Sequence, residues 1–444
     1  MFRKDLLSVD PFPYKASDVF IMNHFQYRNS ELFCEDTAVA DIAKEVGTPF
    51  YLYSRATLDR HFRAFDAGFE GLEHITCFAV KSCSNIAILS LFGKLGGGAD
   101  IVSGGELFRA LQAGIDPRKI IYSGVGKTEK ELRYGLESEI LLFNVESKQE
   151  LQRLNRVAAD MGVKAPVSFR VNPDVDPKTH AYISTGLAKN KFGIPIQEAG
   201  ELYVQASEME HVEVKGVSCH IGSQLTLIAP FIEALRKIKT FVGRLSEKGI
   251  AIQYIDLGGG VGIIYDDEKP PHPQEYAEAI REELSDLEAT LIFEPGRVIA
   301  GNAGILVTEV QYTKTNRGGA KEKHFVVVDA GMNDLTRPSL YGAFHAIQPV
   351  IETGAASRVV DVVGPICETG DFLAKDRDFA AVQQGNLLAV MSAGAYGFTM
   401  ASNYNSRPRV AEVMVDGDQF EVIRERESVE SLIRGEKIPG FLEK

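Results

Sequence analysis

Apolar positions along the chain follow one pattern in its first two thirds and another near its end. From about Ile75 to Pro295, short runs of β-branched and aromatic residues recur, and a stretch with helical spacing of apolar residues follows each run. The runs predict eight strands, at residues 75–80, 99–102, 120–122, 140–144, 167–171, 214–220, 254–257 and 291–294. Eight strands that each precede a helix are typical of a (β/α)8 TIM-like barrel, and this is the fold class we predict.

After Ala303 the pattern changes to strands with few helical stretches between them. These predicted strands lie at residues 305–313, 324–328, 358–363, 387–391, 410–415 and 420–424. The first part of the chain contains Phe20, Phe25 and Phe33 but no complete strand–helix unit, so we expect it to pack with the C-terminal strands. We therefore predict a barrel domain at residues 47–300 and an all-β domain, a sandwich or small barrel, built from residues 1–46 and 301–444.

Composition adds limits on location and partners. The 444 residues are 45% hydrophobic and 25% charged, and no apolar run reaches the roughly 18 residues that span a bilayer. With no secretion-signal pattern after Met1, we expect a soluble cytoplasmic protein without a membrane partner. A net charge of -13 would repel nucleic acid. Five cysteines without a C-x-x-C pair argue against disulfides and zinc, and we expect no metal.

Glycine-rich turns follow the last two predicted barrel strands. Gly258, Gly259 and Gly260 come directly after the seventh strand, and Glu294 to Arg297 end the eighth. Barrel enzymes carry their sites at the carboxyl ends of the strands, often with a phosphate after strands seven and eight. Glycines let backbone N–H groups approach an anion closely. One such turn would more often be only a tight turn; two on adjacent strands favour a phosphate cradle.

A lysine, a carboxylate and a histidine lie at the same predicted end of the barrel. Lys81 ends the first strand, and a desolvated lysine has a lowered pKa and can form a Schiff base with an aldehyde. Together with the phosphate cradle, this predicts pyridoxal phosphate as the cofactor. Glu294 could then keep the pyridine nitrogen protonated, and His220 could stack on the ring. Taken alone, His220 would more often be an ordinary core residue.

Two other patterns are interpreted as having no catalytic role. Residues 124–128 read GVGKT, which ends like a nucleotide-binding loop, but the first glycine of that motif would fall at Ile121, inside a strand. We interpret this segment as a solvated turn. The acidic trio at residues 266–268 is interpreted as a solvated loop and not as a metal site.

Further motifs occur in a constant order along the chain. They are FAVKS at residues 78–82, VSGGEL at 102–107, HAYISTG at 180–186, NKFG at 190–193, CHIGSQ at 219–224, EPGR at 294–297, RPSLY at 337–341, CETGD at 367–371 and GAYGF at 394–398. With this series the chain resembles, over nearly its whole length, the fold-type III pyridoxal-phosphate decarboxylases, whose fold is like that of alanine racemase. Among them it resembles the diaminopimelate decarboxylases.

The resemblance implies roles for many of these residues. Lys81 would hold the cofactor and His220 would stack on it. The other implied cofactor contacts are Ser223, Gly259, Gly260, Glu294, Pro295, Gly296, Arg297 and Tyr396. The resemblance also implies an obligatory homodimer with shared active sites, in which Cys367, Glu368 and Tyr396 reach across the interface. Cys367 would then donate the proton that replaces the lost carboxylate, although most lone cysteines are simply small buried hydrophobes.

The implied substrate is meso-2,6-diaminopimelate, and the implied product is L-lysine, the last step of lysine biosynthesis. This substrate carries an amino acid group at both ends, so its distal end needs recognition of both a carboxylate and an ammonium. Arg297 and Arg337 could bind the carboxylate, with Tyr341 and Tyr396 nearby, and Glu368 could accept from the ammonium.

Two other functions stay open on this reasoning. A decarboxylase of a simpler basic amino acid could use the same scaffold. Such enzymes typically carry an aspartate after the corresponding cysteine, whereas this chain has Glu368. A catalytically silent relative that only binds a partner would usually lack the cofactor lysine or the proton donor. The presence of Lys81, His220, Glu294 and Cys367 argues against that alternative.

Overall fold

Eight parallel strands close into a barrel in the computed structural model, which describes residues 23–176, 190–284, 287–318 and 322–442. Each strand pairs with the next around the barrel, and β8 pairs with β9 to close it. The barrel strands are β5 (His74–Ala79), β6 (Gly98–Ile101), β7 (Ile120–Tyr122), β8 (Leu142–Val145), β9 (Ala165–Asn172), β11 (Val212–Ser218), β12 (Tyr254–Asp256) and β13 (Thr290–Phe293). The predicted barrel is therefore confirmed, strand by strand.

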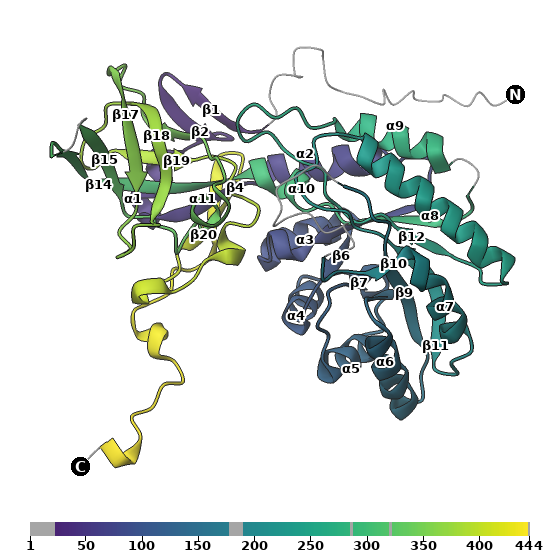
Figure 1. Cartoon of the computed structure of the whole chain (residues 1–444). Helices are drawn as coiled ribbons and strands as arrows, with labels where there is room; N and C mark the ends of the chain where they lie inside the picture. The colour runs from purple at the N-terminus through teal and green to yellow at the C-terminus, as the bar shows by residue number, and fades with distance from the viewer. Residues whose placement is uncertain (1–22, 177–189, 285–286, 319–321, 443–444) are drawn as a thin grey trace, which may run out of the picture.

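Helices surround the barrel on its outer side (Figure 1). They are α2 (Arg55–Ala67), α3 (Ile86–Lys94), α4 (Gly104–Gln112), α5 (Glu129–Glu137), α6 (Lys148–Met161), α7 (Ile196–Ser207), α8 (Ala229–Glu247) and α9 (Pro273–Leu284). Several begin at a side chain that caps their first free N–H groups, such as Ser103, Thr128 and Ser147. A short strand, β10 (Ile194–Pro195), pairs with β9 outside the closed barrel.

The interior of the barrel is apolar at one depth and polar at another. Cys77, Ile121, Leu142 and Ile292 come from four different strands and form a small buried cluster of their own. One to three residues further along the strands, the buried side chains are polar, among them Asp100, Asn144, Ser168, Ser218 and Asp256. Buried polar groups need hydrogen-bond partners. These side chains therefore form a hydrogen-bonded polar layer toward the carboxyl ends of the barrel strands.

A second, nine-stranded sheet forms the mostly-β domain beside the barrel (Figure 1). Its strands are β4 (Phe50–Ser54), β14 (Gly304–Asn316), β15 (Lys323–Val328), β16 (Ile347–Pro349), β17 (Ser357–Val363), β18 (Phe372–Ala380), β19 (Leu387–Val390), β20 (Ala411–Asp416) and β21 (Gln419–Arg424). The predicted strands are all present, but β4, β16 and β18 were missed. In β18 exposed charges such as Lys375 and Asp376 hide the apolar pattern, because this edge strand pairs only with β17.

Strand β4 connects the two parts of the chain. It pairs with β14 on one side and β20 on the other, and all five of its residues are buried. The predicted domain boundaries at residues 46 and 300 stay a prediction. They assign residues 50–54 to the barrel domain, whereas these residues pair with strands of the second sheet. Their continuous apolar run reads like a barrel strand, since burial on both faces gives the same pattern in either place.

The N-terminal part packs against this second sheet. It contains β1 (Phe25–Arg28), β2 (Glu31–Cys34), β3 (Thr37–Ala38) and α1 (Val39–Val46). Phe25, Leu32 and Val39 belong to one buried cluster with Phe50 and Ile305. Residues 1–22, which include Phe20, lie outside the described residues.

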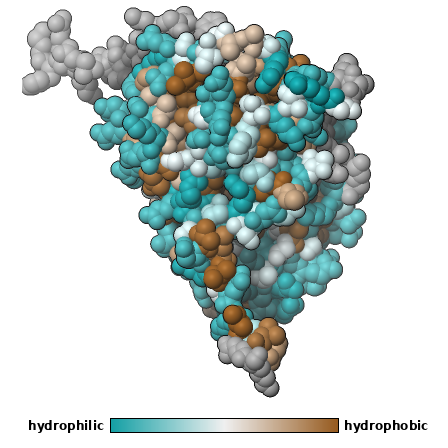
Figure 2. All heavy atoms as spheres, turned by 90° about the vertical axis from the view of Figure 1, so that its left-hand side faces the viewer, coloured by the Kyte–Doolittle hydropathy of each residue, from teal (hydrophilic) through white to brown (hydrophobic). Residues whose placement is uncertain are grey.

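The face of the second domain is mostly hydrophilic, with separate groups of apolar atoms (Figure 2). At the narrow lower end of that view lies the C-terminal segment, which extends away from the domain (Figures 1 and 2). Its exposed apolar residues are Val429, Ile433, Ile438, Phe441 and Leu442. In the part of the chain that the structure describes, no helix has the length and apolarity to cross a bilayer.

Leu52 tests the role of β4 as the connection between the two parts. The Leu52→Ala variant should lower the free energy of unfolding by about 2–5 kcal/mol, because its fully buried side chain lies between Ile305 and Val413. Leu227→Ala is the matched control, since Leu227 is 53% exposed, and it should change stability by less than about 0.5 kcal/mol. Denaturant unfolding followed by circular dichroism measures both; equal losses would contradict the assignment.

Candidate active site

Lys81 lies at the carboxyl end of the first barrel strand. It sits in the short 3-10 helix η2 (Val80–Ser82), which directly follows β5. Its Nζ donates to Oδ2 of Asp100 at 2.5 Å, and Asp100 is fully buried in β6, the neighbouring strand. The lysine side chain keeps about a third of its surface exposed (34%). The ion pair thus holds the amine of a partly exposed lysine at the mouth of the barrel.

The pKa of Lys81 is raised, which corrects the expectation of a lowered pKa. Burial alone would lower the pKa of this amine, but the nearby carboxyl groups of Asp100 and Glu294 outweigh burial. The sequence argument considered desolvation without the anions. Lys81 is therefore a charged ammonium in this state, held in place by Asp100.

Glu294 belongs to a buried group of acids below Lys81. It directly follows β13, and Asp256 ends the neighbouring strand β12. Burial and the charges of Asp100 and Asp256 raise the pKa of Glu294 well above its ordinary value, and burial also raises the pKa of Asp256. Asn144 donates to Asp256 at 2.7 Å, and Ser123 donates to Glu294 at 3.4 Å. Burial and the two neighbouring carboxyl groups therefore favour the neutral form of Glu294.

His220 lies on the opposite side of the same space. Its Nδ1 accepts a hydrogen bond from the backbone N–H of Gly259 at 3.2 Å. Burial, together with the charges of Arg170 and Lys81, lowers the pKa of His220 well below its ordinary value. The ring is therefore neutral, which suits it to contact with a flat aromatic ligand.

The glycine turns approach the site so closely that side chains would collide. A Cβ on Gly259 would lie 2.1 Å from the carbonyl oxygen of Glu294, and one on Gly258 would lie 2.5 Å from Nδ1 of His220. A Cβ on Gly296 would meet the Ser82 side chain at 2.9 Å. The absence of side chains therefore allows the two turns to pack closely against each other, His220 and Ser82, and the predicted phosphate cradle stays a prediction.

A cavity of about 420 Å³ opens between these groups. Its lining combines the two predicted catalytic side chains with a carboxylate, a cation and the turn after β7; its residues are Lys81, Val102, Ser123, Gly124, Val125, Gly126, Glu131, Arg170, Phe192, His220 and Glu294. Two buried polar atoms at this place, Oδ1 of Asp100 and Nη2 of Arg170, have no hydrogen-bond partner among the described residues. Such atoms mark a place built for a polar ligand.

A second, smaller cavity of about 140 Å³ lies next to the glycine turn after β13. Arg297 and Arg337 are both buried in its lining, together with Tyr265 and Tyr341. Arg297 donates to the Tyr265 hydroxyl at 2.6 Å, and the Arg337 guanidinium lies 5.2 Å from the centre of the same ring. Glu268 also lines the cavity, where its Oε2 accepts from the backbone N–H groups of Tyr265 and Asp266. Neither arginine forms an ion pair with a carboxylate that the structure describes. Two buried cations without a paired carboxylate suit an anionic ligand at this place.

Tyr396 lies between Arg297 and the segment that carries Lys81. Its ring lies 4.9 Å from the Arg297 guanidinium, and its backbone N–H donates to the carbonyl of Ser82 at 2.8 Å, next to Lys81. The turn at residues 393–397 packs closely against α10 (Arg297–Ala300) and its neighbours. The expectation that Tyr396 reaches across to a partner subunit stays a prediction.

The sequence matches the family model described as "Pyridoxal-dependent decarboxylase, pyridoxal binding domain" over residues 55–301. It is 55% identical to the diaminopimelate decarboxylase of Pseudomonas aeruginosa over 417 residues, which are 94% of this chain and 99% of that protein. The corresponding protein of Vibrio cholerae is 52% identical over 93% of this chain and 98% of its own length. The chain belongs to the diaminopimelate decarboxylase family.

Solved structures agree with membership of the diaminopimelate decarboxylase family. The enzyme of Helicobacter pylori complexed with L-lysine superimposes with a TM-score of 0.86 at 43% identity, covering 89% of this chain and 98% of that chain. A lysine/ornithine decarboxylase of Vibrio vulnificus complexed with putrescine has a TM-score of 0.74 at 20% identity, covering 85% of this chain and 97% of that chain. The second likeness shows the shared fold alone.

The larger cavity fits the pyridoxal cofactor of the diaminopimelate decarboxylase family. An amine for its aldehyde, a protonated carboxyl for its ring nitrogen and a neutral imidazole for its ring face are present in Lys81, Glu294 and His220. The glycine turns after β12 and β13 lie beside these groups, and the N–H groups of Gly258 and Gly259 donate to Asp256 and His220. Unpartnered buried atoms on Asp100 and Arg170 fit a polar ligand as well.

Some of the predicted site residues lie near the two cavities and others do not. Ser223 accepts from Arg297 at 3.0 Å, and the carbonyl of Pro295 accepts from the Ala79 N–H at 3.0 Å, so both lie at the site. Cys367 and Glu368 instead lie in the exposed loop between β17 and β18, outside the lining of either cavity. The HAYISTG motif at residues 180–186 lies outside the described residues.

Sequence reasoning missed several residues of the site. Asp100, Asp256 and Arg170 belong to three barrel strands, and Tyr265 lies in the loop after β12. The rule that drew attention to Lys81, a charged residue at the end of an apolar strand, would also have found Asp100 and Asp256. Arg170 lies within its strand, and nothing in the local sequence shows which way its side chain points.

The GVGKT turn also differs from its interpretation. Lys127 is buried, and its Nζ donates to Glu150 at 2.7 Å and to the carbonyl oxygens of Gly124 and Asn144. The prediction of a solvated turn is therefore wrong for Lys127, because buried acceptors from three segments replace water around its ammonium group.

The close approach of the glycine turns predicts a loss of stability on adding a single methyl group. Gly259→Ala should lower the free energy of unfolding by about 1–3 kcal/mol, since backbone must move to admit the Cβ. Gly243→Ala, in α8, is the control: nothing lies within 4 Å of its Cβ, and it should be neutral or slightly stabilising. Thermal and denaturant unfolding of both variants measure this; an equally stable Gly259→Ala would contradict the close packing of the turns.

Proposed function

We propose that this protein removes one carboxylate from meso-2,6-diaminopimelate, with pyridoxal phosphate as cofactor, and releases carbon dioxide and L-lysine. The observation that carries the proposal is a pair of cavities with complementary linings. One is lined by the amine Lys81 and the acid Glu294, and the other by the cations Arg297 and Arg337. Tyr396 lies beside Arg297, and its N–H donates to Ser82, next to Lys81. This arrangement suits a substrate that reacts at one end and carries a second anionic group at the other.

In this proposal Lys81 holds the cofactor through a Schiff base. When bound, the cofactor supplies an electron sink for the pair of electrons left by departing carbon dioxide. Glu294 provides the proton at the ring nitrogen, and His220 covers the ring face. The N–H groups of Gly260 and Gly296 bind the phosphate beside Gly259, whose own N–H donates to His220. Ser223, Pro295, Arg297 and Tyr396 complete the cofactor contacts. Support comes from the buried acids around Lys81 and from the contacts that the two glycine turns make.

The distal end of the substrate is assigned to the second cavity. Arg297 and Arg337 bind its carboxylate, and the hydroxyl groups of Tyr341 and Tyr396 lie beside them. Two buried arginines that have no carboxylate partner among the described residues support this assignment, because a buried cation is stable only with compensation. Lysine and ornithine have no distal carboxylate and would leave both cations uncompensated.

A homodimer completes the site in this proposal. Cys367 of the second subunit donates the proton that replaces the carboxylate, and Glu368 accepts from the distal ammonium. The loop that carries both residues is exposed, and so are the Cys367 thiol and the Glu368 carboxyl group. Exposure of both side chains fits residues that act outside their own subunit. The exposed apolar side chains of the C-terminal segment also favour association of two chains (Figure 2).

A substrate panel tests the proposed function. The purified protein with pyridoxal phosphate is given meso-diaminopimelate, ornithine, lysine or arginine, and the release of carbon dioxide and of the amine product is measured. We expect turnover of diaminopimelate alone. Turnover of another amino acid would overturn the substrate assignment, and the absence of any turnover would favour a silent relative that binds a partner.

Arg337→Met should impair recognition of the distal carboxylate. Loss of one charge-assisted contact is expected to raise the KM for diaminopimelate roughly 10- to 100-fold, with a smaller effect on kcat. Arg63→Met, on the exposed side of α2, is the control and should leave both constants unchanged. Steady-state kinetics of the two variants decide: an unchanged KM in Arg337→Met would remove this residue from the substrate site.

Mixing two inactive variants tests the shared site. Lys81→Ala and Cys367→Ala should each be inactive as homodimers. If Cys367 acts in the partner's site, mixed dimers contain one intact site, and random exchange should restore on the order of a quarter of the activity of the unmodified protein. Activity measured after unfolding and refolding of the mixture checks this. A mixture that exchanges subunits but stays inactive would show that Lys81 and Cys367 act within one chain.

A further inference from the structure

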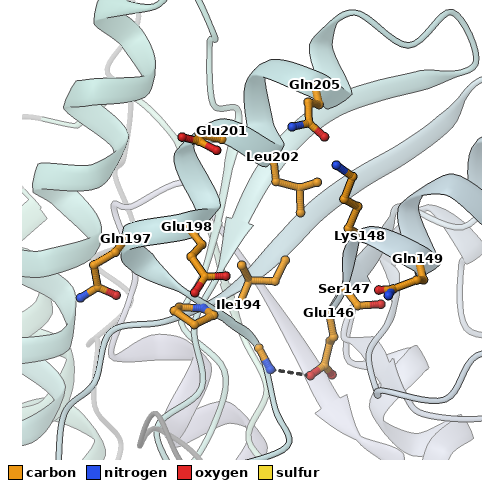
Figure 3. Close-up of a pocket in the computed structure, with 12 residues that line it drawn as sticks. Glu146, Ser147, Lys148, Gln149, Ile194, Gln197, Glu198, Glu201, Leu202 and Gln205 are labelled. Carbon is orange, nitrogen blue, oxygen red and sulfur yellow. Dashed lines mark hydrogen bonds between the residues drawn. The ribbon is translucent and has the colours of Figure 1, made fainter.

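Glu146 lies in the wall between the cofactor cavity and a groove on the outside of the barrel. It follows β8 directly, and only 1% of its side-chain surface is exposed. Figure 3 shows it on one side of the groove, facing the backbone N–H of Gly193, while Glu198, Glu201 and Gln205 of α7 line the groove further along. The groove has a volume of about 480 Å³. No part of the proposed mechanism uses Glu146.

Three different segments meet at the Glu146 carboxylate. Oε2 accepts from the N–H of Gly193 at 2.9 Å (Figure 3), and Oε1 accepts from the N–H of Gly124 at 3.1 Å. Oε1 also lies 3.4 Å from Nη1 of Arg170. Gly124 and Arg170 line the cofactor cavity, and so does Phe192, which precedes Gly193. A single carboxylate therefore holds three parts of one cavity wall.

A second ion pair fixes Glu146 itself. The backbone N–H of Glu146 donates to Glu150 at 2.9 Å, and Glu150 accepts from Lys127 at 2.7 Å. Lys127 in turn donates to the carbonyl of Gly124 at 2.8 Å. The lysine of the GVGKT turn thus has a structural partner, and two anions balance two cations within the wall. This balance is needed because each of these side chains is almost completely buried.

Arg170 is the member of this group that faces the cofactor cavity. Its guanidinium lies 4.7 Å from the centre of the Phe192 ring, and Nη1 is taken by Glu146. Nη2 is buried without a hydrogen-bond partner among the described residues. The charge of Arg170 also acts on His220, where it helps to lower the pKa. With one nitrogen fixed by Glu146, the other is left for a ligand in the cavity.

We propose that Glu146 is a positioning residue for the pyridoxal cofactor: it fixes Arg170, Gly193 and the Gly124 turn so that the free nitrogen of Arg170 meets an acceptor atom of the bound cofactor. This inference rests on the proposed cofactor site. Glu146 itself touches no ligand, and it acts through Arg170. Removing its charge leaves the buried guanidinium without compensation and free to turn away from the cavity.

Equilibrium titration of the full-length apoprotein with pyridoxal phosphate, followed by absorbance of the bound chromophore, measures this effect without relying on turnover. Glu146→Gln keeps the size of the side chain and should raise the dissociation constant roughly tenfold or more. Glu198→Gln, in the same groove but exposed, is the matched control and should bind like the unmodified protein. Circular dichroism of the apoproteins establishes that each variant is folded.

A double-mutant cycle separates positioning from a general loss of structure. Arg170→Met should weaken cofactor binding as Glu146→Gln does, and the double variant should be little weaker than either single variant, because both changes remove one interaction. The proposal would be overturned if the double variant lost affinity for the cofactor by the product of the two single losses. It would also be overturned if Glu146→Gln bound the cofactor with a dissociation constant within twofold of that of the unmodified protein. If Glu146→Gln does not fold, Glu146→Asp takes its place in the cycle with the same criteria. Failure of the unmodified apoprotein to bind the cofactor would instead contradict the cofactor site itself.

Discussion

The ion pair between Lys81 and Asp100 joins the first two barrel strands at the place where three buried acids meet. Asp100, Asp256 and Glu294 end or follow neighbouring strands, and Lys81 is the cation closest to them. Burial and the charges of Asp100 and Asp256 raise the pKa of Glu294, whereas Asp100 is compensated by its ion pair with Lys81. The remaining features of the site can be understood as consequences of this arrangement. The neutral His220, the bare glycine turns and the unpaired arginines each lie around the amine that the acids hold in place.

The two parts of the chain cooperate because the barrel leads directly into the second sheet. Glu294 to Arg297 carry the chain from β13 into α10, and β14 begins a few residues later. The second domain returns Tyr396 and Arg337 to the mouth of the barrel, where they meet Arg297 and Tyr265. Strand β4 binds the start of the barrel domain to the same sheet through β14 and β20. The smaller cavity is therefore built from both parts of one chain, while Cys367 and Glu368 lie on the exposed loop between β17 and β18.

Much of this could be predicted from the sequence, because the period of apolar residues shows where strands and helices lie. The eight barrel strands and the position of Lys81 were predicted for this reason. Local patterns failed where burial and charge depend on distant segments. The edge strand β18 hides behind its exposed charges, Lys127 looks solvated although three segments bury it, and the raised pKa of Lys81 depends on Asp100 in another strand. The contact of Tyr396 with Arg297 of the same chain was also not predicted, since the sequence does not show which side chains a loop will meet.

The account depends most on the claim that Lys81 is the amine that binds the cofactor. Reduction of the holoprotein with borohydride, followed by proteolysis and mass spectrometry, would fix a Schiff base as a stable pyridoxyl group on the lysine that carries it. We expect the modification on the peptide that contains Lys81 and on no other peptide. A pyridoxyl group on a different lysine, or unmodified Lys81 in protein that carries bound cofactor, would contradict the account.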